Sequence, residues 1–157
     1  MLIEESYTIA VLIPCYNEES TISDVVLKFK EVLPNSKIYV YDNNSTDNTY
    51  TLAKESGAIV RKEEYQGKGN VIRRMFADIE ADIYLIVDGD MTYDPSAAQP
   101  MINKLINNNL DMVLCARSEV SNSAYRMGHK LGNYFFSAAI GMLFGKKVSD
   151  ILTGYKV

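Results

Sequence analysis

The chain has 157 residues and a formal net charge of −4, with 47% hydrophobic and 23% charged residues. This length supports one domain with a sizeable core, and the composition excludes a disordered chain and a collagen-like fibre. The acidic balance predicts no nucleic-acid partner. Two cysteines 100 residues apart, Cys15 and Cys115, exclude a disulfide scaffold and a four-cysteine metal site, so we expect reduced core thiols in a cytoplasmic protein.

Short apolar runs alternate with longer amphipathic runs, which predicts a parallel α/β sheet with helices on both faces. Ser20 or Thr21 is expected to cap the first helix, and the second should begin at Thr46 or Asp47 and stop at Gly57. The predicted strands are residues 7–14, 37–42, 58–63, 82–90 and 111–118. The predicted helices are residues 21–32, 46–55, a loop and helix over 67–82, 95–108 and 123–144.

Neither end of the chain carries a predicted membrane segment. The N-terminal apolar run follows Glu4 and Glu5, whereas a signal peptide has positive charge there. The apolar residues 131–144 are fewer than the roughly 20 that a bilayer-spanning helix needs. The sequence has no repeat, low-complexity tract or linker, so we expect a single domain over residues 1–157.

Ligands of such a sheet bind beyond the carboxyl ends of the strands, so the polar residues there are the candidates. Asp88 and Asp90 flank Gly89 at the end of a hydrophobic run. Two carboxylates so close repel each other unless a cation intervenes, and Mg²⁺ takes one or two carboxylates plus phosphate oxygens. A divalent metal holding a diphosphate is one interpretation, in which Gly89 lets the backbone approach the ligand, and a polar turn is the other.

Two further loops offer polar groups at this edge. The run DNNSTD, residues 42–47, suits hydrogen bonds to a base or ribose, but it also suits a turn with a helix cap. The run QGKGN, residues 66–70, opens a helix, and its glycines and Lys68 indicate either an anion site or a glycine-rich turn. It does not match a P-loop, and no GxGxxG follows the first strand, which disfavours a dinucleotide-binding domain.

Basic residues follow the fifth predicted strand. Arg117 ends that strand, and Arg126 and Lys130 lie four residues apart, on one face of the next helix. They can grip one anion together or form an ordinary solvated face. His129, the only histidine, has no triad or metal-ligand spacing and is expected on the helix surface.

Taken in this order, the motifs resemble those of family 2 glycosyltransferases with the GT-A fold, and most of all the dolichyl-phosphate (polyprenyl-phosphate) mannosyltransferase-like branch. The resemblance covers nearly the whole chain. It implies a nucleotide-diphospho-sugar transferase fold with a mostly parallel central sheet, and with the C-terminal part of the family domain missing. The matching stretches are IPCYNEESTI, YDNNSTDNT, YQGKGNVIRR, IVDGDMTYDP, MVLCARS and DILTGYKV.

The resemblance also implies roles for single residues. Asp88 and Asp90 would bind Mg²⁺ or Mn²⁺ with the sugar diphosphate, and Asp90 would act in catalysis. Asp150 is a candidate base or acceptor-orienting residue. The residues implied to contact the nucleotide or its diphosphate are Pro14, Tyr16, Glu18, Asp42, Asn43 and Lys68. Those implied to hold the acceptor phosphate or the donor diphosphate are Arg117, Arg126 and Lys156, and Arg117 would also stabilise charge during catalysis.

Two positions depart from the family's pattern. The loop DNNSTD stands where DDGSTD is common, so Asn43 replaces a carboxylate and leaves the base preference open. Thr92 stands two residues after the acidic pair, where the polyprenyl branch often has Gln, so the metal preference can differ.

The resemblance implies an inverting enzyme that moves a hexose from a UDP- or GDP-sugar to an acceptor, with polyprenyl phosphate favoured. Such an enzyme would be cytoplasmic, with peripheral membrane contact through its acceptor or a missing C-terminal segment. The alternatives are a non-catalytic nucleotide-sugar-binding domain and a transferase with a saccharide acceptor. The apolar residues 134–144 are expected to form core helix, to face a lipid tail or to support a homodimer.

Overall fold

The computed structural model describes residues 7–115 and 153–157. Within these ranges, no helix combines the length and the apolar character needed to cross a bilayer. The predictions for Arg117, Arg126, His129, Lys130, Asp150 and the helix over 123–144 concern residues outside the described part.

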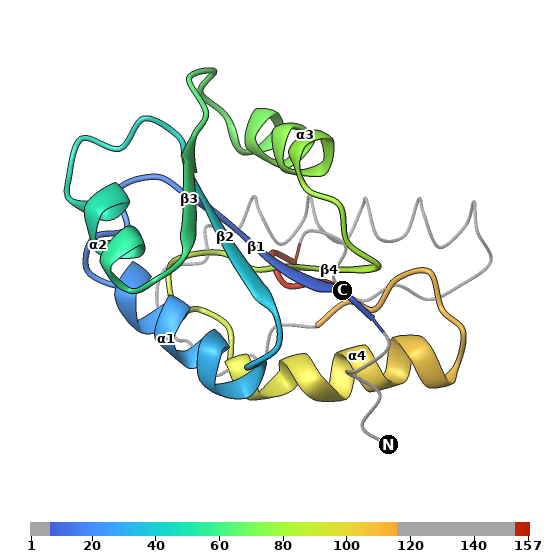
Figure 1. Cartoon of the computed structure of the whole chain (residues 1–157). Helices are drawn as coiled ribbons and strands as arrows, with labels where there is room; N and C mark the ends of the chain where they lie inside the picture. Colours follow the sequence, from blue (N-terminus) through green and yellow to red (C-terminus); the bar gives the residue numbers. More distant parts are fainter. Residues whose placement is uncertain (1–6, 116–152) are drawn as a thin grey trace, which may run out of the picture.

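A parallel sheet forms the centre of the fold, as predicted. It consists of β1 (Ile9–Cys15), β2 (Lys37–Asp42), β3 (Ile59–Lys62) and β4 (Ile83–Ile86) in the order β3-β2-β1-β4. Every residue of β1 is buried, because this strand has a neighbour on each edge and helices over each face (Figure 1). The strand β4 ends at Ile86, four residues before the predicted end, so the acidic pair lies in the loop beyond it.

Helices cover both faces of the sheet, also as predicted. The helices α1 (Ile22–Val32), α2 (Thr49–Glu55) and α4 (Ala98–Asn107) lie on one face, and α3 (Lys68–Asp78) lies on the other (Figure 1). A short 3₁₀ turn, η2 (Pro95–Ala97), precedes α4. Successive side chains of a strand point to opposite faces. Accordingly, Val11 and Ile13 belong to the core under α1, and Leu12 belongs to the core under α3.

The residues at the starts of α1 and α2 differ from the predicted helix caps. Thr21 is the residue before α1, but its hydroxyl donates to the carbonyl oxygen of Gly89 at 2.7 Å and does not cap the helix. The helix α2 begins at Thr49, so the predicted start at Thr46 or Asp47 was too early; a carboxylate oxygen of Asp47 accepts the Thr49 N–H at 3.0 Å. Gly57 follows α2 with φ of +81°, so the predicted stop is confirmed.

The fifth predicted strand is replaced in the described part by shorter pairing with the C-terminal residues. Val113 and Val157 exchange both backbone hydrogen bonds, at 2.8 and 3.0 Å, and Lys156 does the same with Ile86 at 2.8 and 3.0 Å. Residues 155–157 therefore run antiparallel between β4 and residues 113–115. Of the two cysteines, Cys15 is buried as expected, while Cys115 is only half-buried.

Candidate active site

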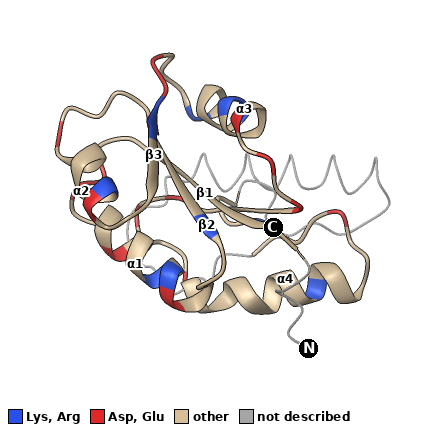
Figure 2. Ribbon diagram, in the orientation of Figure 1, with Lys and Arg blue, Asp and Glu red and all other residues tan. Residues whose placement is uncertain are grey.

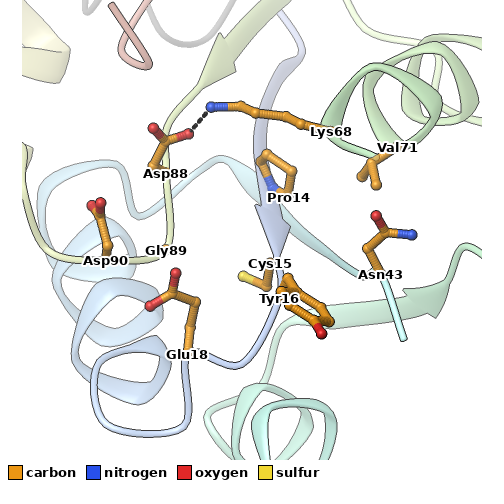
Figure 3. A pocket seen from close by; sticks show the side chains of 10 residues that line it. All are labelled: Pro14, Cys15, Tyr16, Glu18, Asn43, Lys68, Val71, Asp88, Gly89 and Asp90. Atoms are coloured by element: carbon orange, nitrogen blue, oxygen red, sulfur yellow. Dashed lines mark hydrogen bonds and ion pairs between the residues drawn. The ribbon is translucent and has the colours of Figure 1, made fainter. Parts of the chain in front are cut away.

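A pocket of about 310 Å³ opens beyond the carboxyl ends of β1 and β4, where the sheet was expected to bind ligands (Figure 3). The loops after β1 and β4 and the start of α3 supply most of its wall. Its lining residues are Pro14, Cys15, Tyr16, Glu18, Asn43, Lys68, Val71, Asp88, Gly89 and Asp90. Four of the sequence-predicted regions therefore meet in one place: the stretch after the first strand, the run DNNSTD, the run QGKGN and the acidic pair.

Acidic side chains crowd one side of the pocket. Glu18, Asp88 and Asp90 lie along it, while Tyr16 and Asn43 lie toward the other side (Figure 3). Burial raises the pKa of the Glu18 carboxyl, and the negative charge of Asp90 raises it further. A carboxylate oxygen of Asp90 accepts the backbone N–H of Thr92 at 3.0 Å. The crowding shows that additional positive charge would be favourable here.

Lys68 already supplies one positive charge. It is the first residue of α3, and its ammonium group forms an ion pair with the Asp88 carboxylate, as Figure 3 shows. The Lys68 side chain is 54% exposed, whereas that of Asp88 is 23% exposed. Figure 2 shows further basic residues on β3 and α3, namely Arg61, Lys62, Arg73 and Arg74, and others on α1, α2 and α4.

The donor set around Asp88 and Asp90 fits a divalent metal that shares its ligands with a diphosphate. No group of three or more His, Cys, Asp or Glu side chains in the described residues could hold an ion without outside ligands. Mg²⁺ commonly uses one or two protein carboxylates and completes its shell with substrate phosphates and water. Asp88 and Asp90 meet that requirement, since both line the pocket beside Lys68.

Hydrogen bonds to the loop after β2 and to the start of α2 hold Tyr16 and Glu18 at the pocket. The N–H of Asn17 donates to the Ser45 hydroxyl at 2.9 Å, and the N–H of Glu18 donates to the Thr49 hydroxyl at 2.8 Å. Thr49 is fully buried, so this bond is shielded from water. Tyr16 itself is 49% exposed and leaves a ring face available to a planar ligand.

Asn43 lines the pocket, but its side-chain amide is bonded to the protein backbone. The amide nitrogen donates to the carbonyl oxygens of Glu63 and Tyr65, at 2.8 and 3.0 Å. Its oxygen accepts the N–H of Gly67 at 2.7 Å. Asn43 therefore ties the end of β2 to the loop that leads into Lys68, a function that spacing in the sequence did not indicate.

Two predicted contacts are not part of this pocket's lining. Asp42 is 1% exposed, and its carboxylate accepts the N–H of Ser45 at 3.1 Å. The backbone of Lys156 lies in the sheet between Ile86 and Leu114. Nucleotide or phosphate contacts by Asp42 and Lys156 stay predictions.

The sequence analysis missed Cys15 and Val71 as lining residues. Cys15 follows Pro14 at the end of β1, and Val71 lies one helical turn after Lys68, so each was detectable from a predicted neighbour. Gly89 was expected to give space to a ligand. That role stays a prediction. The protein itself also requires glycine here, because a Cβ would lie 2.7 Å from the Cys15 sulfur.

Residues 10–155 match the sequence profile of Glycosyl transferase family 2. The chain belongs to this family. It is 54% identical over 126 residues to Protein RfbJ of Shigella flexneri, covering 80% of this chain and 98% of RfbJ. It is 25% identical to a dolichol-phosphate mannosyltransferase of Pyrococcus furiosus, covering 91% of this chain and 43% of that protein.

Solved structures confirm the predicted GT-A type fold. The crystal structure of Mycobacterium tuberculosis glucosyl-3-phosphoglycerate synthase superposes with a TM-score of 0.78 at 25% identity, covering 98% of this chain and 58% of that one. A further crystal structure of the synthase contains Mn²⁺, UDP and glucosyl-3-phosphoglycerate, and it superposes with a TM-score of 0.72 at 25% identity, covering 57% of that chain. The chain thus spans about half the length of these longer relatives.

Proposed function

We propose that this family 2 glycosyltransferase moves a hexose from a nucleoside-diphosphate sugar to a polyprenyl phosphate, with inversion at the anomeric carbon. One observation carries the proposal: Asp88, Asp90 and Lys68 meet beside Tyr16 in a single pocket at the carboxyl end of the sheet. That combination offers ligands for a metal–diphosphate unit and an aromatic ring for a base. The synthase complex with Mn²⁺ and UDP supports this use of the pocket.

Each of these four pocket residues then has a definite role. The Tyr16 ring stacks on the base, a contact that is typically worth about 1–3 kcal/mol per base. Lys68 leaves Asp88 and donates to the incoming diphosphate, because a multiply charged diphosphate attracts an ammonium group more strongly than one carboxylate does. Asp88 and Asp90 would hold a Mg²⁺ or Mn²⁺ ion, which when bound would neutralise charge on the leaving diphosphate.

The acceptor is the finer part of the proposal. A polyprenyl phosphate is already anionic near neutral pH, so it needs positioning and charge compensation more than a general base. The dolichol-phosphate mannosyltransferase relative supports this acceptor, and the synthase relative suggests a small phosphorylated acid as its rival. Arg117, Arg126 and Lys130 are the residues we expect to meet the acceptor phosphate.

A binding panel tests the donor site. Melting temperatures are measured with UDP, GDP, dTDP and CDP, each with and without Mn²⁺, for the wild-type chain and Asp90→Ala. Because a ligand that binds only the folded state raises stability by mass action, at least one nucleotide should raise Tm in a Mn²⁺-dependent way. Asp90→Ala should lose this response, and an unchanged Mn²⁺-dependent affinity in the variant would refute the metal assignment.

A transfer assay tests the acceptor. The matching nucleotide sugar is incubated with a polyprenyl phosphate, with 3-phosphoglycerate or with no acceptor, and the released nucleoside diphosphate is measured. The proposal predicts release that depends on the polyprenyl phosphate. If the nucleoside diphosphate is released only with 3-phosphoglycerate, the acceptor is a small phosphorylated acid and not a polyprenyl phosphate. If the nucleotide binds in a metal-dependent way but is never released from its sugar, the chain is better explained as a non-catalytic binding domain.

A further inference from the structure

The C-terminal residues lie against the proposed metal ligand. Lys156 exchanges both backbone hydrogen bonds with Ile86 at the end of β4, and Asp88 follows two residues later. This pairing brings Gly154 beside the Asp88 side chain. Two regions separated by more than 60 residues in sequence therefore share one wall of the pocket.

Gly154 touches the carboxylate so closely that no side chain fits between them. A Cβ built at Gly154 would lie 2.6 Å from Cγ of Asp88 and 3.0 Å from its Oδ1, and it would approach Oδ2 more closely still. These three Asp88 atoms are its nearest neighbours. The Asp88 carboxylate is thus confined between the Gly154 backbone and the Lys68 ammonium group.

The backbone at Gly154 is held firmly in place. Its N–H donates to the hydroxyl of Tyr93 at 2.6 Å, and the hydroxyl of neighbouring Thr153 donates to the carbonyl oxygen of Cys115 at 2.7 Å. The Tyr93 and Tyr155 rings pack with their centroids 5.5 Å apart. These contacts fix the chain on each side of Gly154. Moving the Gly154 backbone away from Asp88 would therefore break hydrogen bonds and ring packing.

We propose that Gly154 is a positioning residue for Asp88, and that Tyr93 holds it there. The absence of a Cβ leaves room for one orientation of the carboxylate, facing Lys68 and the pocket, and the fixed backbone excludes orientations that point back toward the sheet. A methyl group at this position would push the carboxylate out of that orientation. The functional consequence rests on the proposed function, in which Asp88 binds the metal–diphosphate unit.

A double-mutant cycle separates action through Asp88 from a local backbone effect. The variants are Gly154→Ala, Asp88→Ala and the double variant, with Gly69→Ala as the matched control because nothing lies within 4 Å of its added methyl. Urea midpoints are measured for all. Gly154→Ala should lower the midpoint of the wild-type chain and leave that of Asp88→Ala unchanged, because truncation removes all three clashing atoms. An equal loss in both backgrounds would overturn the proposal.

Nucleotide affinity distinguishes a positioning role from a purely structural one, because a purely structural role would leave the affinity of the folded protein unchanged. Affinity is measured by calorimetry, with and without Mn²⁺, for the nucleotide among UDP, GDP, dTDP and CDP that binds the wild-type chain. Gly154→Ala should weaken the Mn²⁺-dependent affinity at least tenfold, and Tyr93→Phe, which keeps the ring but removes the hydroxyl, should weaken it in the same direction. An unchanged affinity in folded Gly154→Ala refutes the positioning role. If the wild-type chain shows no metal-dependent binding to any nucleotide of the panel, the proposed function fails, while the urea cycle still decides whether Gly154 constrains Asp88.

Discussion

The side chain of Asn43 offers a sharp test of how the pocket is held together. The substitution Asn43→Asp keeps the shape of the side chain but replaces an NH₂ donor by an acceptor. The carbonyl oxygens of Glu63 and Tyr65 would each lose their hydrogen bond from this side chain and would face a carboxylate oxygen instead. Only the bond from the Gly67 N–H to position 43 would survive.

The expected cost follows from burial. Asn43 is 4% exposed, and a buried polar group left without its partner costs about 1–3 kcal/mol. With two carbonyl groups affected, Asn43→Asp should lower the free energy of unfolding by about 2–4 kcal/mol at pH 7. Urea denaturation followed by circular dichroism measures this directly.

The pH dependence of that loss has a definite sign. Facing two carbonyl groups, the new carboxyl group should have a pKa in the folded state above its unfolded value of about 3.9. A raised folded pKa means stability that is present below the unfolded pKa and lost as pH rises through the folded one. The deficit of Asn43→Asp should therefore be smaller at pH 4 than at pH 7.

Asn44→Asp is the matched control for this substitution. Asn44 makes one such bond, from its amide nitrogen to the Glu64 carbonyl oxygen at 2.6 Å, but it is exposed, so water replaces the lost partner. Its φ of +64° suits Asp nearly as well as Asn. The control should cost less than about 1 kcal/mol. Equal losses in the two variants, or a loss in Asn43→Asp that does not change with pH, would refute the reasoning.

Two further predictions concern groups away from the pocket. The buried hydroxyl of Tyr155 has no hydrogen-bond partner among the described residues, so Tyr155→Phe should raise the free energy of unfolding by about 1 kcal/mol in urea, and a clear fall would contradict this. A hydrogen bond from Arg74, with others from Tyr41 and Arg61, holds the pKa of Asp78 below its ordinary value, so its stabilisation is present above pH 4 and lost as pH falls through the lowered pKa. Asp78→Asn should thus lower Tm by about 2–6 °C at pH 7 and by less at pH 3, and a deficit that stayed constant with pH would count against the network.

The fold could be predicted from the sequence because its strands are short, continuous apolar runs. The run over residues 37–42 matches β2 residue for residue, and the run over 58–63 contains β3 with one extra residue at each end. Backbone pairing between residues far apart in the sequence leaves no such signal in the local sequence. Val113 and Val157 pair across 44 residues, and the described part of the predicted strand pairs antiparallel with the C-terminal residues.

The pocket was predictable to the extent that sheet geometry decides it. The carboxyl ends of neighbouring parallel strands meet at one edge, so the residues after β1 and β4 had to lie together. The roles that sequence could not predict belong to polar side chains bonded to distant backbone. Thr21 was expected to cap its own helix and instead binds the carbonyl oxygen of Gly89, which places the start of α1 against the acidic loop.

The contacts that the sequence did not predict all restrict loops that carry charged pocket residues. Glu18, Lys68 and Asp88 each lie in or next to a loop, where backbone freedom would spread their charged groups over many positions. Uncharged residues restrict these loops. The buried Thr49 hydroxyl holds the Glu18 backbone, and the buried Asn43 amide holds the loop that leads into Lys68. Gly154, which has no space for a side chain, restricts Asp88. Charged groups held in advance lose less entropy when a diphosphate binds, so these uncharged residues should contribute to donor affinity by keeping the charged groups in position.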